Sequence, residues 1–382
     1  MKTKALRIGV MTGGGDCPGL NAAIRAVSKS LMINCSAQIV GIQDGFLGLI
    51  ESRVTPLNYA DCSGILSTGG TILGTNNSAN PFNFKGEDLS AKVMDYYFSL
   101  ELDGIVVIGG DGSLSIAYEL SKLGMNIVGI PKTIDNDLMG TDRTFGFDTA
   151  IGIVTDALDR LRTTGQSHKR VMILETMGRY AGWIALHAGI AGGADVILIP
   201  EFDYDIDVVA KACMMRMSDQ HYSIVVVAEG AKPIGGELTV RETKEFSTDP
   251  IRLGGIANIL KLQLEPKIDA EIRATTLGYI QRGGTPSAFD RIFATNLGCY
   301  AASLVANKQF GTVVVLKDNQ LSCTSLKQVA NKSKLVTTET PELASALSMG
   351  ICFGNTHLSA KLPNLKQKVS GGGDAHWPRA KA

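Results

Sequence analysis

The segment Pro131–Asp137, with the sequence PKTIDND, places two carboxylates beside a lysine and a threonine. Residues i and i+2 of an extended chain point to the same side, so Asp135 and Asp137 are expected to face one point. One carboxylate there can take the proton of a hydroxyl while the other binds a metal ion, with Lys132 and Thr133 beside them. Phosphoryl transfer requires such parts, namely a base that orients the nucleophile and cations that neutralise spreading charge. A solvated acidic turn is the alternative, and it is disfavoured because the segment follows the apolar run NIVGI.

Two glycine-rich segments begin predicted helices directly after apolar runs. Thr12–Asn21 reads TGGGDCPGLN, and Gly109–Ser113 reads GGDGS. Glycines let backbone N–H groups face an anion, and a helix N-terminus adds positive partial charge, so both segments predict phosphate binding. Asp111 offers a hard oxygen to Mg²⁺, and Ser113 offers a hydroxyl and an N-cap. Pro18 replaces the third glycine of a dinucleotide fingerprint, no P-loop lysine follows, and an ordinary tight turn stays open for each segment.

Four arginines beside turns are candidates for binding a phosphorylated substrate, because the guanidinium group binds phosphate through a planar, often bidentate fork. These candidates are Arg170, Arg179, Arg273 and Arg282. Glu229 ends an apolar strand-like run and could accept hydrogen bonds from sugar hydroxyls. Each of these residues, taken alone, is equally compatible with an ordinary structural or surface position.

Short apolar runs alternate with helical patterns, which predicts an α/β fold with mainly parallel sheets. The predicted strands are Arg7–Met11, Gln38–Ile42, Gly104–Ile108, Asn126–Ile130, Val171–Glu175, Asp195–Ile199, Ser223–Ala228 and Thr312–Leu316. Asn21–Met32 and Thr149–Thr163 are predicted helices. The polar segments follow directly after strands, and ligands of open α/β sheets bind at the carboxyl ends of the strands. We therefore expect the candidate residues to meet at one edge.

The chain has 382 residues, enough for two domains. A formal net charge of zero without a basic stripe argues against nucleic acid as a partner. No apolar run reaches ~18 residues, so no membrane-spanning helix is expected, and the start lacks a signal-peptide pattern, which favours the cytoplasm. Seven scattered cysteines without CxxC fit a reducing compartment and no zinc site. The Gly-rich end, residues 362–382, is expected to be a flexible tail.

The motifs GGGDCPGLNAAIR, GGDGS, PKTIDND, MGRYAG and RATTLGYIQRGG together resemble the phosphofructokinase family in order and spacing. The resemblance implies two similar, Rossmann-like, three-layer α/β/α domains with the active site in the cleft between them. Residues 1–146 plus 281–335 would form the larger, phosphoryl-donor domain. Residues 147–280 plus 336–361 would form the smaller, sugar-phosphate domain. The implied reaction uses ATP and Mg²⁺ to phosphorylate the 1-hydroxyl of fructose 6-phosphate, in a homotetramer or homodimer.

The resemblance also assigns roles to single residues. Asp135 matches the general base, with Thr133 and Asp137 beside the reacting hydroxyl, and Asp111 matches the magnesium-linked carboxylate. The nucleotide contacts are matched by Gly15, Gly112 and Ser113. The fructose 6-phosphate contacts are matched by Met177, Gly178, Arg179, Glu229 and Arg282, and Arg179 is also expected to be catalytic. Arg170 and Arg273 match arginines that reach the sugar phosphate from a neighbouring subunit.

Three positions depart from the commonest family pattern. Gly112 follows Asp111 as in ATP-using members, whereas pyrophosphate users usually carry an Asp there that would repel the α-phosphate of a nucleotide. Lys132 is common in pyrophosphate users, although one ATP-using branch has it, and it is expected to supply the charge of an Arg missing near Asn77. Tyr279 replaces a His that often contacts the sugar phosphate. We favour ATP over pyrophosphate, with a non-catalytic sugar-phosphate-binding subunit as a remote alternative.

Overall fold

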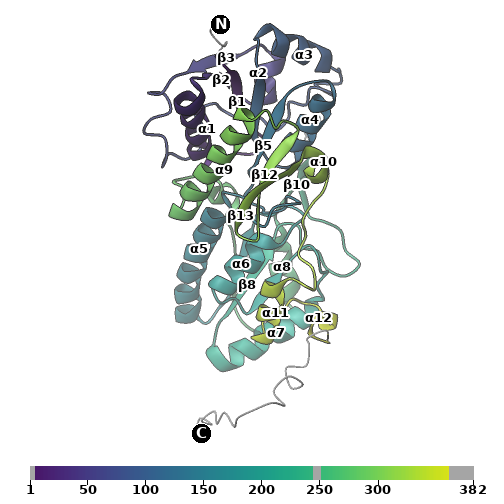
Figure 1. Cartoon of the computed structure of the whole chain (residues 1–382). Helices are drawn as coiled ribbons and strands as arrows, with labels where there is room; N and C mark the ends of the chain where they lie inside the picture. Colours follow the sequence, from purple (N-terminus) through teal and green to yellow (C-terminus); the bar gives the residue numbers. More distant parts are fainter. Residues whose placement is uncertain (1–4, 244–250, 361–382) are drawn as a thin grey trace, which may run out of the picture.

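The computed structural model describes residues 5–243 and 251–360, which form two main sheets flanked by helices (Figure 1). The larger sheet has seven strands in the order β13-β12-β5-β4-β1-β2-β3. They are β1 (Arg7–Gly13), β2 (Gln38–Ile42), β3 (Val54–Leu57), β4 (Gly104–Gly109), β5 (Ile127–Pro131), β12 (Thr312–Lys317) and β13 (Gln320–Ser325). The inner pairs are parallel, and the outermost strands β3 and β13 run antiparallel to their neighbours.

Helices cover both faces of this larger sheet. The helices on one face are α1 (Leu20–Cys35) and α9 (Ala288–Ala306), and those on the other are α2 (Phe46–Ile50), α3 (Ser90–Ser99), α4 (Asp111–Lys122) and α10 (Leu326–Val329). Along β4, Val106 and Ile108 belong to the first core, whereas Ile105 and Val107 belong to the second. Successive strand side chains point to opposite faces, so an uninterrupted apolar run marks a strand buried on both sides.

The smaller sheet has four parallel strands in the order β11-β6-β8-β7. They are β6 (Val171–Thr176), β7 (Val196–Leu198), β8 (Ser223–Ala228) and β11 (Ile272–Thr276). Helices α5 (Phe147–His168) and α6 (Trp183–Ala191) pack on one face, and α7 (Ile206–Gln220) and α8 (Ile256–Leu264) pack on the other. The predicted α/β fold of three-layer units with mainly parallel sheets is therefore confirmed.

The chain leaves the larger sheet after β5, builds the smaller sheet, and returns to the larger one with β12. This path agrees with a larger unit assembled from two stretches of chain, although the exact domain boundaries stay a prediction. The short elements α11 (Pro341–Ser348) and α12 (Thr356–Ala360) follow on the side of the smaller sheet (Figure 1). The predicted tail at 362–382 lies outside the described residues.

A two-stranded antiparallel hairpin, β9 (Val240–Thr243) and β10 (Ile251–Leu253), stands apart from both main sheets. The 3₁₀ helix η1 (Gly278–Gln281) follows β11. Within the two described ranges, no helix combines the length and apolar character needed to cross a membrane.

Candidate active site

The segment that follows β5 bends sharply, so the strand-like course predicted for Asp135 and Asp137 is wrong. Asn136 has φ 53°, a left-handed conformation that Asn tolerates better than most residues. The Thr133 hydroxyl accepts a hydrogen bond from the Asp135 N–H at 3.0 Å, and Asn136 Oδ1 accepts one from the Thr144 N–H at 3.1 Å. These local bonds hold the bend, and it still brings Asp135 and Asp137 to the same hollow.

Asp135 is 6% exposed, and its two carboxylate oxygens differ. Oδ2 accepts a hydrogen bond from the Thr133 hydroxyl at 3.3 Å. Oδ1 is buried and has no hydrogen-bond partner among the described residues. Buried carboxylate oxygens nearly always find a donor, so an open one at the wall of a hollow is suited to a hydroxyl of a bound molecule.

Asp111 and Asp137 carry carboxylates that resist ionisation. Burial, together with the charge of Asp135, raises the pKa of Asp137, and the Arg179 guanidinium opposes this shift. Burial also raises the pKa of Asp111, while hydrogen bonds from the Ser115 hydroxyl (3.3 Å) and the Asn331 N–H (3.1 Å) act the other way. Both carboxylates are therefore held in a buried setting that disfavours their charged forms, and a bound cation would favour ionisation.

A hollow of about 250 Å³ lies at the carboxyl ends of β1, β4 and β5, and we call it the donor hollow after the phosphoryl donor that the family resemblance implies. The predicted residues that line it are Gly15, Asp111, Gly112, Ser113, Lys132, Thr133, Asp135, Asp137, Arg179 and Arg282. The two glycine-rich loops and the segment after β5 therefore meet at one edge of the larger sheet, whereas the motif after β6 reaches this hollow from the smaller sheet.

Glycines in the two loops allow the close approach that forms the donor hollow. A Cβ on Gly13 would lie 2.6 Å from Ser113 Oγ, and a Cβ on Gly15 would overlap the Arg282 guanidinium. Ser113 is 6% exposed and lies inside the first turn of α4, whose N-cap is Gly110. The predicted N-cap role of Ser113 is therefore wrong, because the N-cap lies three residues earlier, at Gly110.

Lys132 is 3% exposed, and its ammonium group donates a hydrogen bond to the Gly15 carbonyl. Desolvation by burial lowers its pKa, and the nearby carboxylates of Asp135 and Asp16 oppose that shift. A buried cation at the glycine-rich loop is well placed to attract a phosphoryl group.

The oxygen donors around the donor hollow fit Mg²⁺, which the family resemblance implies. Asp111, Asp135 and Asp137 all line this hollow, and Mg²⁺ prefers carboxylate oxygens. In the described part of the chain, no group of three or more His, Cys, Asp or Glu side chains is placed to hold a metal ion by itself. Mg²⁺ is usually held by one or two carboxylates plus substrate phosphates, so an open set of this kind is suitable.

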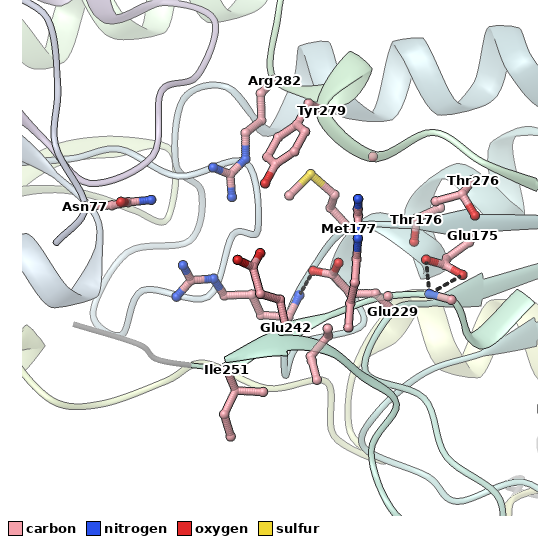
Figure 2. A pocket seen from close by; sticks show the side chains of 16 residues that line it. Asn77, Glu175, Thr176, Met177, Glu229, Glu242, Ile251, Thr276, Tyr279 and Arg282 are labelled. Atoms are coloured by element: carbon pink, nitrogen blue, oxygen red, sulfur yellow. Dashed lines mark hydrogen bonds between the residues drawn. The ribbon is translucent and has the colours of Figure 1, made fainter. Parts of the chain in front are cut away.

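A second hollow of about 470 Å³ adjoins the first at the carboxyl ends of β6, β8 and β11 (Figure 2), and we call it the sugar hollow after the acceptor that the family resemblance implies. Among the predicted residues it is lined by Met177, Arg179, Glu229, Tyr279 and Arg282. Arg179, Arg282 and Asn77 line both hollows and so mark their junction. Gly178 lines neither; with φ 140° it shapes the turn that presents its neighbours.

Glu229 follows β8 directly and faces the sugar hollow (Figure 2). Its Oε1 accepts a hydrogen bond from the Arg179 N–H at 3.0 Å. Burial, reinforced by the charge of Asp135, raises the pKa of Glu229 to about 7. A carboxylate in this state can accept hydrogen bonds from sugar hydroxyls near neutral pH.

The structure adds Glu175 and the β9–β10 hairpin to the sugar hollow, and the sequence analysis assigned neither to the site. Glu175 is 2% exposed and lies on β6. Its carboxylate accepts hydrogen bonds from the N–H groups of Gly255 (3.0 and 3.1 Å) and Ala257 (2.9 Å) at the start of α8. Arg241 and Glu242 of the hairpin also line this hollow. The sequence MILETMGR could have indicated Glu175, because this glutamate lies at the end of an apolar strand, four residues before Arg179.

Arg170 and Arg273 line neither hollow. They lie beside each other at the opposite, amino-terminal ends of β6 and β11, where both bind the Glu271 carboxylate. A contribution to the active site of the same chain is therefore not supported, and the predicted contribution to a neighbouring subunit stays a prediction.

Sequence comparisons give consistent matches along the chain. A family model described as Phosphofructokinase matches residues 7–305. The ATP-dependent 6-phosphofructokinase 2 of Clostridium perfringens is 48% identical over 360 residues, covering 91% of this chain and 98% of that protein. The pyrophosphate–fructose 6-phosphate 1-phosphotransferase of Streptomyces coelicolor is 43% identical over 350 residues, covering 91% and 100%.

Solved structures agree with this result. Pichia pastoris phosphofructokinase in the T-state superimposes with a TM-score of 0.74 at 30% identity, and the match covers 91% of this chain and 37% of that longer one. A pyrophosphate-dependent phosphofructokinase from Marinobacter aquaeolei gives a TM-score of 0.76 with 94% and 91% coverage; at 20% identity this likeness concerns the fold alone. The chain belongs to the phosphofructokinase family.

Proposed function

We propose that this protein is a 6-phosphofructokinase that transfers the γ-phosphoryl group of ATP to the 1-hydroxyl of fructose 6-phosphate, giving fructose 1,6-bisphosphate. The observation that carries the proposal is the open Oδ1 of Asp135 at the wall of the donor hollow. The adjoining sugar hollow of about 470 Å³ gives the acceptor a place beside it. A sugar hydroxyl needs such a base, and general-base catalysis contributes roughly 10²–10⁴-fold.

The residues that line the two hollows have different roles in the proposed reaction. Asp135 Oδ1 accepts the hydrogen bond of the 1-hydroxyl and takes its proton as the new P–O bond forms, while the bond from the γ-phosphorus to the β,γ-bridging oxygen breaks and ADP leaves. Thr133 fixes the carboxylate through Oδ2. Glu229 binds ring hydroxyls, and Arg179 and Arg282, at the junction, attract the transferring group. Holding acceptor and donor in line is the main part of such catalysis.

Asp111 and Asp137, which both line the donor hollow, would hold Mg²⁺ at the donor phosphates. When bound, the ion would neutralise charge on the phosphoryl oxygens. Lys132 adds a fixed positive charge at the Gly15 loop, where Arg282 also lies. Donor binding would rest on the backbone of the two glycine-rich loops and on Ser113.

ATP is proposed as the donor, since Gly112 leaves room in the donor hollow where pyrophosphate users usually carry a carboxylate. The relatives named above include an ATP-dependent enzyme and a pyrophosphate-dependent one at similar identity, so pyrophosphate is the second candidate. Arg170 and Arg273 are proposed to reach the sugar phosphate of a neighbouring copy in a homodimer or homotetramer. We also propose a cytoplasmic location, because the scattered cysteines without CxxC fit a reducing compartment.

The deciding experiment assays the purified protein with fructose 6-phosphate, Mg²⁺ and either ATP or pyrophosphate, with direct detection of fructose 1,6-bisphosphate. We expect turnover with ATP at least tenfold above turnover with pyrophosphate. The reverse ratio would replace ATP by pyrophosphate in the proposal. Binding of fructose 6-phosphate without turnover by either donor would make the chain a sugar-phosphate-binding subunit and reject the enzyme proposal.

A further inference from the structure

A crossing segment, residues 333–336, lies beside the catalytic base, and the inference drawn from it rests on the proposed function. The crossing segment meets the larger unit at Ser333, which forms an isolated bridge with Leu138 and lines the donor hollow. The N–H of Lys334 then donates a hydrogen bond to the Asp137 carbonyl at 2.7 Å. The crossing segment is therefore bound directly to the bent segment after β5, which carries the proposed base.

The crossing segment is also held by the smaller unit. The indole N–H of Trp183, the first residue of α6, donates a hydrogen bond to the Lys334 carbonyl at 2.8 Å. The Val336 N–H donates to Glu201 Oε1 at 2.9 Å, and the same oxygen accepts a bond from the Gly182 N–H at 2.9 Å. The backbone of Lys334 is thus fixed from both units, so its side chain starts from a fixed position.

The ammonium group of Lys334 binds three oxygens of the segment after β5. It donates hydrogen bonds to the Asp142 carbonyl at 2.9 Å, the Thr141 carbonyl at 3.0 Å and Asn136 Oδ1 at 3.3 Å. A lysine ammonium has three N–H donors, so this arrangement can use all of them. One side chain therefore ties the bend at Asn136 to the later part of the same segment.

Asn136 connects these bonds to the proposed base. It follows Asp135 directly and has φ 53°, so a change of its backbone angles would turn the Asp135 side chain toward a different point. The bond that the Asp135 carboxylate receives from the Thr133 hydroxyl is 3.3 Å long, which is longer than usual for two oxygens. The direction of Asp135 Oδ1 therefore depends on how firmly Asn136 is held.

Lys334 reaches the base from outside the two hollows. Asp135 and Asp137 line the donor hollow, whereas Asn136, between them, lines a third hollow of about 800 Å³ together with Lys334. Lys334 lines neither the donor hollow nor the sugar hollow, and its ammonium group lies 5.3 Å from the centre of the Trp183 ring. Any effect of Lys334 on the reaction must therefore pass through the segment after β5.

We propose that Lys334 is a positioning residue for phosphoryl transfer, which holds the bent segment after β5 so that Asp135 Oδ1 meets the 1-hydroxyl of the acceptor. Three oxygens converge on its ammonium group, and a side chain without N–H donors would leave all three without this partner. The bend would then relax and move the carboxylate. A displacement of about 1 Å at a reacting group can cost ~10²-fold in rate.

The test compares Lys334→Met and Lys334→Arg with the wild type in steady-state assays with fructose 6-phosphate and ATP. In the Met variant kcat should fall by ~10–100-fold while each KM stays within about threefold, because Lys334 lines neither hollow. The Arg variant keeps the charge and the donors and should recover part of the loss. Lys122→Met is the matched control, since Lys122 also lies over an aromatic ring, that of Tyr118, but pairs with Glu119 at the surface. Its kcat should change by less than about twofold.

A double variant separates positioning from a general structural role. Once Asp135→Asn has removed the base, its direction no longer matters, so adding Lys334→Met should lower kcat by less than about threefold. A further fall of ~10–100-fold would show a role independent of Asp135 and would overturn the proposal, as would a wild-type kcat in Lys334→Met. Calorimetric binding of fructose 6-phosphate checks that each variant is folded. If Lys334→Met does not fold, Lys334→Gln, which keeps two N–H donors, takes its place in both experiments.

The wild-type assay separates this inference from the proposed function. If the wild type transfers no phosphoryl group from ATP or pyrophosphate, the proposed function fails, and the positioning role fails with it. If the wild type turns over with one of these donors and the Lys334 variants match it, the role of Lys334 alone is rejected.

Discussion

The buried carboxylate of Glu175 provides the sharpest test of how the sugar hollow is built. It meets the start of α8 through the N–H groups of Gly255 and Ala257 at 2.9 to 3.1 Å. The N-terminus of a helix carries unsatisfied N–H groups and positive partial charge, so a carboxylate there is stabilising. Glu175→Gln keeps the shape but replaces one acceptor oxygen by an NH₂ group that faces a donor.

The expected cost follows from these contacts. A hydrogen bond to a charged group contributes ~1.5–3 kcal/mol, and the helix dipole adds up to ~2 kcal/mol, while relief from burying a charge offsets part of the loss. We expect a net destabilisation of about 2–3 kcal/mol. With an unfolding entropy of ~0.7 kcal/mol/K for ~350 residues, the Tm should fall by ~3–4 °C. Because Gly254 and Gly255 line the sugar hollow, KM for fructose 6-phosphate should also rise, by roughly 3–10-fold.

The assay is thermal unfolding at constant protein concentration, together with steady-state kinetics. Glu265→Gln is the matched control, because Glu265 is the C-cap residue of α8 and its exposed carboxylate pairs with Lys261 at 3.6 Å. Such a pair contributes little, so Tm should change by less than about 1 °C. An unchanged Tm and KM in Glu175→Gln, or an equal fall of Tm in the control, would show that Glu175 does not hold the start of α8 in place.

The remaining predictions concern three acidic or basic side chains of the two hollows. Asp135→Asn should lower kcat by ~10²–10⁴-fold with little change in fructose 6-phosphate binding, measured by steady-state kinetics and calorimetry; full activity would remove Asp135 from the mechanism. Lys132→Met should lower kcat by ~10²–10³-fold, as expected when a positive charge beside the reacting group is removed. The Tm should not fall, because the substitution removes a buried charge. A fall in Tm alongside the loss of activity would indicate a structural role. The pKa of Glu229 is raised from 4.5 to about 7, so its favourable contribution to folding is complete below pH 4.5 and is lost as pH rises to 7. At ~1.4 kcal/mol per pH unit, urea titrations should show wild-type stability falling by ~3 kcal/mol relative to Glu229→Gln across that range, and parallel pH profiles would contradict the assignment.

The sequence alone predicted the parts of the fold that depend on continuous apolar runs. Strands such as β4 and β8 are buried on both faces, so their pattern is unambiguous, and each predicted strand overlaps an observed one. The outer strands β3 and β13 and the edge strand β11, with the sequence IRATT, were missed. Their residues are mixed, because an edge or partly exposed strand need not be apolar on both faces.

The convergence of the candidate site was also predictable, since its motifs follow strands of parallel sheets. The bent course of the segment after β5 could not be predicted from the sequence. The left-handed Asn136 depends on a bond from Thr144, and the role of Glu175 depends on a helix start about 80 residues further along the chain. Strand β9, which carries Arg241, is short, polar and exposed, so no apolar pattern marked it in the sequence.

The path of the chain has a consequence for synthesis on the ribosome. Strand β5 pairs with β12 through Val128 with Thr312 and Gly129 with Val313, and β12 is made only after the whole smaller sheet. Until then, a nascent chain that has completed β5 carries an apolar strand whose edge lacks this partner. Open edges of this kind recruit foreign strands, so chaperone contact should be concentrated in that interval of elongation.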